Sequence, residues 1–543
     1  MAGVSGVDGI GRPTIAPMTG PVFETIPELF DHAAETAPDA NWVITDDASW
    51  TFGDAARHVD RLAAGLAAAG MAQGDRVIVT ARNEPRYLFT WFALMQLGAV
   101  QVPLNPASSA AEFGGFVGQV RPVAIVTDRA LRDTLLPVAG EVGLLDVDEL
   151  ATADAGDAPR ARVGPEDLAV FIPTSGTTGR SKLVMQTQRA YAWAGTSFPS
   201  WMQLDVGDRL MTSLPLFHIN APAYSTLGSV ALGTGLVLLP RFSASDFVDA
   251  ARRHGATEFN AIGAMLEILM RQPERSDDAD NPLRRCYTGP SPSERRQREI
   301  EERFGVELVC GYALSESPFG LIWRPGTRPY GTLGWLRQHP VLGEVNEARV
   351  VDDDGNEVAD GEVGELQLRN PTVMRGYFEM PDETAAVVDH DGWLHTGDLV
   401  EANGGGLATF VGRRKEVIRR RGENLSPLEV EARLEQHPDV AEAAVVGVPS
   451  DMSEGTSRRS SWWPKGGISR SRRCTGTAST VSRGTRCPAT SRSSTSCPTR
   501  RPAASPSPNF PATGTTGRST PMPDPDDPVI GGHRRSTPLG AQR

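Results

Sequence analysis

Residues 173–182 are the part of this chain best suited to hold phosphate, and they read Pro-Thr-Ser-Gly-Thr-Thr-Gly-Arg-Ser-Lys. Glycines let backbone N–H groups approach an anion, hydroxyls add further donors, and Lys182 adds a positive charge. A short apolar run, residues 168–172, precedes the loop and reads as a buried strand. We therefore predict that phosphate is bound beside Lys182 by Thr174, Ser175, Gly176, Thr177, Thr178 and Gly179.

Two alternative roles for this loop are less well supported by its residues. Ser, Thr and Gly also gather in ordinary surface loops, but ten consecutive positions of one phosphate-loop type favour binding. A P-loop NTPase needs Gly-Lys followed directly by Ser or Thr. Gly179 is followed here by Arg180 and Ser181, which excludes that class.

Two carboxylates further along the chain could complete a nucleotide site. Glu316 lies beyond a predicted strand at residues 306–310, where α/β sheets bind ligands, and a hard carboxylate oxygen can hold Mg²⁺. Asp398 follows a glycine and could accept two hydrogen bonds from a ribose diol. The alternatives are a solvated surface carboxylate for Glu316 and a core or turn residue for His218, which stands among apolar neighbours.

These motifs, in this order, resemble those of the acyl-adenylate-forming superfamily, also called the AMP-binding or ANL superfamily, and within it the acyl-CoA synthetases. The phosphate loop departs from the common pattern at Ser181, where proline is usual, and at Leu183, where glycine is usual. Residues 311–316, Gly-Tyr-Ala-Leu-Ser-Glu, resemble the pattern Gly-Tyr-Gly-Met-Thr-Glu. Residues 214–221, Leu-Pro-Leu-Phe-His-Ile-Asn-Ala, are most similar to carnitine/crotonobetaine-CoA ligase-like enzymes.

The resemblance implies a role for each matching position. The implied catalytic residues are Lys182, His218, Glu316, Arg413 and Lys415, with Glu316 as the Mg²⁺ ligand. The implied nucleotide- or CoA-binding residues beyond the loop are Gly289, Tyr312, Ser315, Asp398, Arg413 and Gly422. Tyr312 would pack on adenine, Asp398 would bind ribose, and His218 would wall the tunnel for the acyl group and the thiol. Lys415 would be the hinge of a rotating C-terminal domain.

The implied activity is that of an ATP-dependent, AMP-forming acyl-CoA ligase. A carboxylate attacks the α-phosphate of ATP, giving acyl-AMP and pyrophosphate, and the CoA thiol then attacks the acyl-AMP; Mg²⁺ assists the first step. Two alternatives stay open: an adenylation enzyme that loads a carrier protein, and a nucleotide or acyl-AMP binder with impaired catalysis. The expected partners are a carboxylic acid, ATP and CoA, without nucleic acid, and a homodimer is left open.

The composition of the chain predicts a soluble, cytoplasmic globular enzyme. The 543 residues are 39% hydrophobic, which is enough for a large core in more than one domain. The longest uncharged stretch, residues 219–240, is interrupted by Asn, Pro and Gly, and residues 1–20 lack a basic-then-apolar leader. Cys286 and Cys310 show neither disulfide nor metal-ligand spacing, as expected in a reducing compartment.

The elements that would position the site alternate between helix and strand. Thr51 and Asp54 resemble a capping box before an Ala/Leu-rich helix, and residues 76–79 and 123–128 read as strands with a helix at 86–97 between them. Such alternation predicts an α/β fold with parallel sheets covered on both faces. Glycine-rich turns at residues 361–377 predict an additional small β subdomain.

The expected domain order follows from these elements. Residues 1–20 are expected to be a flexible N-terminus, and residues 21–411 to be the AMP-binding domain. Residues 412–455 would start a small, mobile α+β C-terminal domain, with a helix start at residues 426–429 and a strand at residues 445–448. Residues 456–543 are expected to be disordered.

The tail, residues 456–543, differs in composition from the rest. It carries 15 Lys and Arg against three Asp, a net charge of +12. Because the whole chain has a net charge of −13, residues 1–455 have a net charge of −25. Aliphatic residues are scarce in it, so this tail cannot bury a core. A basic tail that binds nucleic acid would use lysine freely, yet Lys465 is the tail's only lysine. We favour a coding sequence that is read out of frame.

The out-of-frame hypothesis makes a prediction about the coding DNA. When the reading frame is shifted to start on the third base of each codon, the codons of residues 456–464 can encode a strand-like run that begins Asp-Val-Lys-Ala-Val. Residues 496–507 can encode a stretch ending Val-Pro-Lys, which resembles the superfamily's last motif, Pro-Lys-Thr-x-x-Gly-Lys. We expect sequencing of the gene to reveal a frame change near codon 456. An uninterrupted frame, with these tail residues confirmed in the protein, contradicts the hypothesis.

Overall fold

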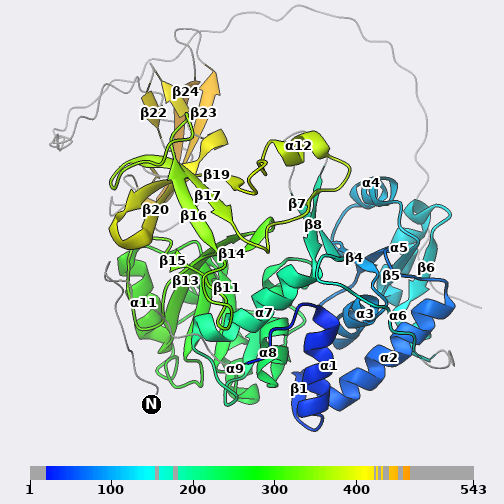
Figure 1. The fold of residues 1–543 in the computed structure, drawn as a ribbon. Coiled ribbons are helices and arrows are strands. Elements are labelled where there is room, and N and C mark those ends of the chain that lie inside the picture. The colour runs from blue at the N-terminus through cyan, green and yellow to red at the C-terminus, as the bar shows by residue number, and fades with distance from the viewer. Residues whose placement is uncertain are drawn as a thin grey trace, which may run out of the picture. The chain divides into compact units, whose positions relative to one another are not determined.

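The computed structural model describes residues 20–152, 158–174, 181–416, 440–449 and 456–464, together with 418–420, 423–425, 430–431 and 434. Over these residues the protein is α/β, with two large mixed sheets and a smaller antiparallel sheet, as predicted (Figure 1). The predictions for residues 1–19 and for the helix start at 426–429 lie outside the described residues. None of the described helices is long and apolar enough to cross a bilayer.

The first large sheet has seven strands in the order β18-β8-β7-β4-β3-β5-β6. Strands β7, β4, β3, β5 and β6 run parallel, whereas β8 and β18 close the sheet in antiparallel pairs. The bounds are β3 Arg76–Thr80, β4 Val100–Pro103, β5 Ala124–Thr127, β6 Gly143–Asp146, β7 Leu168–Thr174, β8 Lys182–Thr187 and β18 Gly376–Tyr377. The strands predicted at 76–79, 123–128 and 168–172 are thus confirmed.

The second large sheet has nine strands in the order β15-β14-β13-β12-β11-β9-β10-β1-β2. Its central strands, from β13 to β1, are parallel, and the antiparallel strands lie at both ends. The bounds are β1 Asn41–Ile44, β2 Ser49–Thr51, β9 Leu210–Thr212, β10 Leu236–Leu238, β11 Glu258–Ile262, β12 Arg285–Gly289, β13 Glu307–Leu314, β14 Ser317–Ile322 and β15 Trp335–Leu336.

The predicted small β subdomain is the four-stranded antiparallel sheet β16-β17-β19-β20. Its strands are β16 Glu347–Val351, β17 Val363–Arg369, β19 Leu394–Asn403 and β20 Leu407–Arg413. The turn at Gly376 and Tyr377 was expected in this subdomain, but these residues form β18 and pair with β8 of the seven-stranded sheet. Backbone pairing with β8 therefore places Tyr377 in a different sheet from the one its glycine-rich neighbourhood suggests.

Short strands follow β20. The strand β20 continues to Arg413, past the predicted domain boundary at 411, and the 3₁₀ turn Arg414–Glu416 comes next. Strands Ile418–Arg420 (β21) and Glu423–Leu425 (β22) pair with each other, and Val440–Pro449 (β23) pairs with Thr456–Pro464 (β24). Disorder was expected from residue 456, but β24 is an extended partner of β23. Main-chain hydrogen bonds need no aliphatic side chains, and Thr and Trp suit strands.

Helices cover both faces of the seven-stranded sheet, and alternate side chains of β3 show this directly. Val77 and Val79 belong to the main core with α2 and α3, whereas Ile78 belongs to a separate core with α4 and α5. The helices are α1 Ile26–Thr36, α2 Phe52–Ala68, α3 Pro85–Gln96, α4 Ala110–Val120, α5 Arg129–Ala139, α6 Val147–Thr152, α7 Gln188–Met202, α8 Leu227–Leu232, α9 Phe247–His254, α10 Gly263–Met270, α11 Glu294–Phe304 and α12 Pro381–Ala385.

The start of α2 confirms the predicted capping box. The Thr51 side chain accepts from the Asp54 backbone N–H, and the Asp54 carboxylate accepts from the Thr51 backbone N–H. The face predicted to be apolar, with Val59, Leu62 and Leu66, is buried. The cap therefore fixes where α2 begins, and the apolar stripe fixes which side faces the core.

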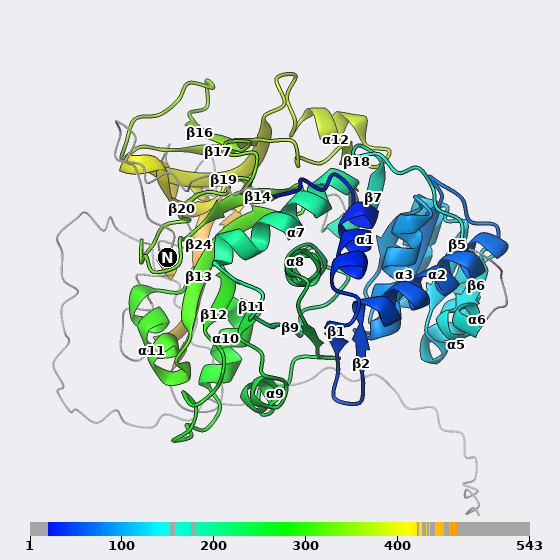
Figure 2. The ribbon, with the colours of Figure 1, turned by 60° about the horizontal axis from the view of Figure 1, so that its bottom comes forward.

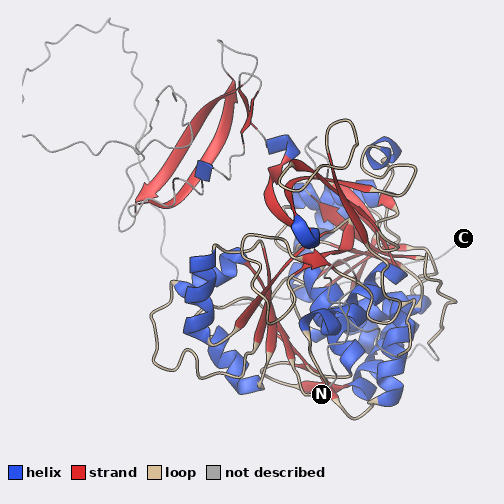
Figure 3. Ribbon diagram, turned by 60° about the vertical axis from the view of Figure 1, so that its left-hand side comes forward, coloured by secondary structure: helices blue, strands red, loops and turns tan. Residues whose placement is uncertain are grey.

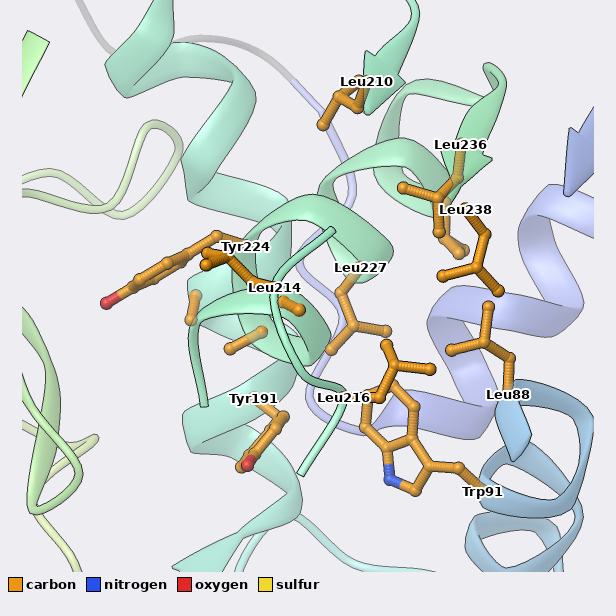
Figure 4. Close-up of a cluster of buried hydrophobic side chains, with 14 of the residues drawn as sticks. Leu88, Trp91, Tyr191, Leu210, Leu214, Leu216, Tyr224, Leu227, Leu236 and Leu238 are labelled. Carbon is orange, nitrogen blue, oxygen red and sulfur yellow. The ribbon is translucent and has the colours of Figure 1, made fainter. Parts of the chain in front are cut away.

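Helix α7 connects the two large sheets. It contacts β7 and β8 of one sheet and β14 of the other, and it packs closely against α8 (Figure 2). Figure 3 shows the strands of both sheets between helical layers. The core beside α8 contains Leu214 and Leu216 from the segment before His218, together with Trp91 of α3 and Leu227 of α8 (Figure 4). The segment that carries His218 is therefore anchored by its apolar residues.

Glu258 of β11 is a buried carboxylate without a hydrogen-bond partner among the described residues. Its exposure is 0%, and neither carboxylate oxygen accepts a hydrogen bond. Burial, and then the negative charge of Asp208, raise the pKa of the Glu258 carboxyl well above its usual range. The folded chain therefore keeps a proton on Glu258 that the unfolded chain releases.

We expect Glu258→Gln to reduce the loss of stability at rising pH. The stabilising contribution of the retained proton is complete below the unfolded Glu pKa of about 4.3 and is lost as the pH rises toward the folded pKa. Glutamine cannot ionise, so the variant lacks this decline. Thermal melting between about pH 5 and about pH 8 measures it. The matched control Glu35→Gln, at an exposed position of α1, should keep the wild-type slope. A wild-type slope in Glu258→Gln contradicts the interpretation.

Candidate active site

The turn that carries Glu316 lies where the two large sheets meet. The strand β13 runs to Leu314, so Gly311 and Tyr312 belong to this strand, whereas a loop was expected after residue 310. Only Ser315 and Glu316 form the turn to β14. Across the seam, the Gln186 side-chain amide of β8 donates to the Ser315 carbonyl at 2.6 Å. The Met374 backbone N–H donates to the Glu316 carbonyl at 2.8 Å. The turn is thus held by β8 of the other sheet at Ser315 and by the segment that precedes β18 at Glu316.

Tyr377 joins two of the predicted catalytic residues. The Lys182 ammonium lies 4.3 Å from the centre of the Tyr377 ring, and the Tyr377 hydroxyl donates to Glu316 Oε1 at 2.8 Å. Burial, and then the nearby Glu316 charge, raise the pKa of Tyr377, so that its hydroxyl stays protonated as a donor. A cation and a carboxylate that are 134 positions apart in the sequence are brought together through one ring.

Neither Tyr377 nor Gln186 was identified as a site residue from the sequence. Gly376 and Tyr377 carried a signal, a glycine followed by an aromatic residue, but it was interpreted only as a turn. No local signal marks Gln186, which is fully buried within β8. Its role follows only from the pairing of sheet edges that are distant in the sequence.

A second cluster gathers Tyr312, Asp398 and Arg413. The Tyr312 hydroxyl donates to Asp398 Oδ2 at 2.7 Å, and Arg413 Nε lies 3.2 Å from Asp398 Oδ1. Asp398 and Arg413 are opposite each other in the β19–β20 pair, and Asp398 is 2% exposed while Arg413 is half exposed. Burial, and then Asp398, raise the pKa of Tyr312 well above its usual range. A ribose diol would share the remaining lone pairs of Asp398.

Gly289, Thr174 and Lys182 lie at the ends of strands. A Cβ on Gly289, the last residue of β12, would lie 2.6 Å from the Gly311 carbonyl, so glycine is needed for this approach of β12 and β13. Thr174 and Lys182 are opposite each other in the β7–β8 pair and close the root of the loop. The residues predicted to bind phosphate between them, Ser175, Gly176, Thr177, Thr178 and Gly179, lie outside the described residues, as does Gly422.

His218 and Lys415 are not joined to either cluster. Within the described residues, His218 shares no hydrogen bond or ion pair with the clusters. It is exposed and its ring lies against Phe217. It also lines a small cavity with Trp91, Gln101 and Tyr191. Although the residue as a whole is exposed, partial desolvation of its imidazole lowers the pKa of His218. Lys415 is exposed in the 3₁₀ turn after β20.

The α/β fold and the two clusters suit a nucleotide site, and comparison with known proteins shows the class of the protein. Residues 30–378 match the family model described as AMP-binding enzyme. The chain therefore belongs to the AMP-binding enzymes, and the predicted superfamily is confirmed. Its similar proteins are CoA ligases.

Individual relatives are similar over most of their length. The chain is 33% identical over 445 residues to the sulfoacetate–CoA ligase of Cupriavidus necator, covering 79% of this chain and 86% of that protein. It is 31% identical over 407 residues to the crotonobetaine/carnitine–CoA ligase of Salmonella typhimurium, covering 70% and 77%. The O-succinylbenzoate–CoA synthetase of Bacillus subtilis in complex with AMP superposes with a TM-score of 0.73 at 27% identity, covering 82% and 89%.

The Lys182–Tyr377–Glu316 arrangement predicts how two Tyr377 variants differ. Tyr377→Phe keeps the ring under Lys182 and removes the hydrogen bond to Glu316, so Mg·ATP affinity should fall by about 2- to 10-fold. Tyr377→Leu removes the ring as well and should cost more affinity. Isothermal titration measures both. The matched control is Tyr330→Phe, whose ring also lies against an arginine, Arg298, and it should leave the affinity unchanged. Wild-type affinity in both Tyr377 variants contradicts the arrangement.

Proposed function

We propose that this protein activates a carboxylic acid with ATP, forming acyl-AMP and pyrophosphate, and transfers the acyl group to CoA. The observation that carries the proposal is that each cluster takes one member from β13 or from the turn that follows it. Tyr312, which bonds Asp398, lies within β13, and Glu316, which bonds Tyr377, lies just after this strand. These two members of the two clusters are four positions apart in the sequence. That spacing suits a single nucleotide lying along the strand end.

The residues present fit a magnesium ion bound with the nucleotide. No group of three or more His, Cys, Asp or Glu converges in the described part of the chain, so the protein offers no complete metal cage there. Mg²⁺ at ATP sites is usually held by one or two carboxylates plus phosphate oxygens, and Glu316 can supply one. When bound, the ion would neutralise charge on the phosphates. The related synthetase of Bacillus subtilis has been solved with ATP and magnesium.

The chain's own side chains would bind and orient the reactants. Lys182, held over the Tyr377 ring, would meet the negative charge of the α-phosphate as the carboxylate attacks and pyrophosphate leaves. Tyr377 would remain a neutral donor and keep Glu316 in place. Asp398 would bind the ribose hydroxyls, with Arg413 beside it. His218, at the edge of its cavity and with a lowered imidazole pKa, would face the thiol path as a neutral group.

In the proposed reaction the two domains have different roles. Residues 21–411 would bind ATP and the acid, and residues from 412 onward would rotate about Lys415 between the two steps. The 3₁₀ turn that contains Lys415 directly follows the β20 strand carrying Arg413, which suits a hinge next to the nucleotide. CoA is the proposed acceptor because similar proteins are CoA ligases.

A second candidate function has an observation of its own. In the present frame the tail lacks the superfamily's last motif, so the chain could bind ATP and acyl-AMP while catalysing adenylation weakly.

The identity of the acid is a separate question. Names of similar proteins include ligases for sulfoacetate, indoleacetate and crotonobetaine or carnitine, so the family relationship does not select the acid.

Pyrophosphate exchange tests the proposal and its second candidate together. We expect the chain as it stands to bind Mg·ATP but to show little carboxylate-dependent ATP–pyrophosphate exchange, because the final lysine is missing. A chain with the frame restored from codon 456 should regain exchange by at least about 100-fold and form acyl-CoA with a suitable acid. Exchange at full rate by the present chain contradicts the impairment. Failure of the restored chain with every acid in a broad panel contradicts the ligase function.

A further inference from the structure

The strand β19 bulges at Asp398, where it pairs with β17. Between two paired positions, β17 has one residue, Leu366, whereas β19 has three, residues 396–398. A bulge of this kind increases the local twist and turns a side chain away from the direction that a regular strand would give it. Asp398 is the last residue of this bulge, so the bulge determines where its carboxylate points.

The polar groups of the bulge have partners outside the regular ladder of the two strands. The Thr396 hydroxyl donates to the Leu366 carbonyl at 2.6 Å and accepts from the Asp398 backbone N–H at 3.1 Å. The Gly397 backbone N–H donates to Glu365 Oε1 at 3.0 Å. Because a buried backbone N–H without a partner is costly, these bonds favour one conformation of the bulge. The bond to Glu365 has a carboxylate as its acceptor, and such bonds are the stronger ones.

Glu365 is well placed to hold the bulge. It is 5% exposed and belongs to β17, an inner strand of the four-stranded sheet. Its other oxygen, Oε2, lies 3.3 Å from His395 Nδ1 and 4.0 Å from Nη1 of Arg414, in the turn after β20. A carboxylate enclosed by packed neighbours on an inner strand keeps its orientation. Glu365 can therefore fix the position of the Gly397 amide.

The carboxylate of Asp398 is held independently at both of its oxygens. The Tyr312 hydroxyl donates to Asp398 Oδ2 at 2.7 Å, and Arg413 Nε lies 3.2 Å from Asp398 Oδ1. Glu365 acts at a different point, the backbone amide that precedes Asp398. Side-chain contacts and a fixed backbone together leave the remaining lone pairs of Asp398 directed one way.

From these contacts we infer that Glu365 is a positioning residue for the nucleotide: by holding the Gly397 amide, it aims the Asp398 carboxylate at the ribose hydroxyls of ATP. Glu365 acts through the backbone of the bulge and does not touch the nucleotide. Without its oxygen the Gly397 N–H loses its partner and the bulge rearranges, so the ribose contact weakens while the phosphate contacts at Lys182 stay. The inference rests on the proposed function, because it presumes that Asp398 binds the ribose.

Two nucleotides that differ only in the ribose hydroxyls test the inference. The full-length chain is titrated calorimetrically with Mg·ATP and with its 2′,3′-dideoxy analogue, and the ratio of the two affinities measures the ribose contact. The wild-type chain should prefer ATP by about 10- to 100-fold. Glu365→Met keeps the length of the side chain but has no oxygen, and it should reduce this preference by about 5- to 10-fold without changing the affinity for the dideoxy analogue.

A conservative variant and a matched control separate positioning from a general structural effect. Glu365→Gln keeps an oxygen for the Gly397 N–H and should retain most of the preference. Glu362→Met, just before β17, removes a carboxylate that also accepts a backbone N–H, that of Ala359 at 3.0 Å, and should keep the wild-type preference. An unchanged ratio in Glu365→Met, including equal losses for both nucleotides, overturns the inference.

Two further variants distinguish the possible failures. If Glu365→Met does not fold, Glu365→Asp decides in its place, because its shorter side chain withdraws the oxygen from Gly397 and the same loss of preference is expected. Asp398→Ala should abolish the preference for ATP. If the wild-type chain has no preference, or if Asp398→Ala keeps it, the proposed ribose role of Asp398 fails and the inference with it. If only the Glu365 variants behave like the wild type, the role of Glu365 alone fails.

Discussion

The contact on which the candidate site depends is the one between two sheet edges, made by Tyr377, Gln186 and the turn at Ser315 and Glu316. Each sheet alone presents half of the chemistry: the seven-stranded sheet carries Lys182, and the nine-stranded sheet carries Glu316. The hydrogen bonds across the seam hold the carboxylate of Glu316 near the Lys182 cation, and in the proposed reaction both groups would meet phosphate. Because the partners on both sides are buried or half-buried, this geometry is set before any ligand binds.

Within the nine-stranded sheet, close approach beside the strand that leads to Glu316 requires glycine at two positions. Gly289 and Gly311 let β12, β13 and the guanidinium of Arg337 approach each other without a Cβ between them. The space beside Gly311 is filled by the Tyr287 ring and the Arg337 guanidinium. Any side chain at Gly311 would therefore have to displace both groups.

Much of this architecture is readable from local patterns. The capping box at Thr51 and the strands at residues 76–79 and 168–172 depend on residues close in the sequence, and the structure confirms them. Tyr377 and Gln186 could not be found in this way. Their significance arises from contacts between segments 61 to 195 positions apart, which neither periodicity nor a short motif encodes. The β18 strand illustrates the same limit, since two residues carry too little pattern to reveal the sheet they join.

The pairing of β23 with β24 affects how the protein behaves with its neighbours in solution. The strand β23, Val440–Pro449, is rich in alanine and valine, and such a strand left open along one side can recruit the same strand of another copy. Residues 456–464 occupy one side of it despite their unusual composition, and two arginines of β24 sit in that ladder. Among the described residues, pairing with β24 therefore covers one of the two edges along which such recruitment could take place.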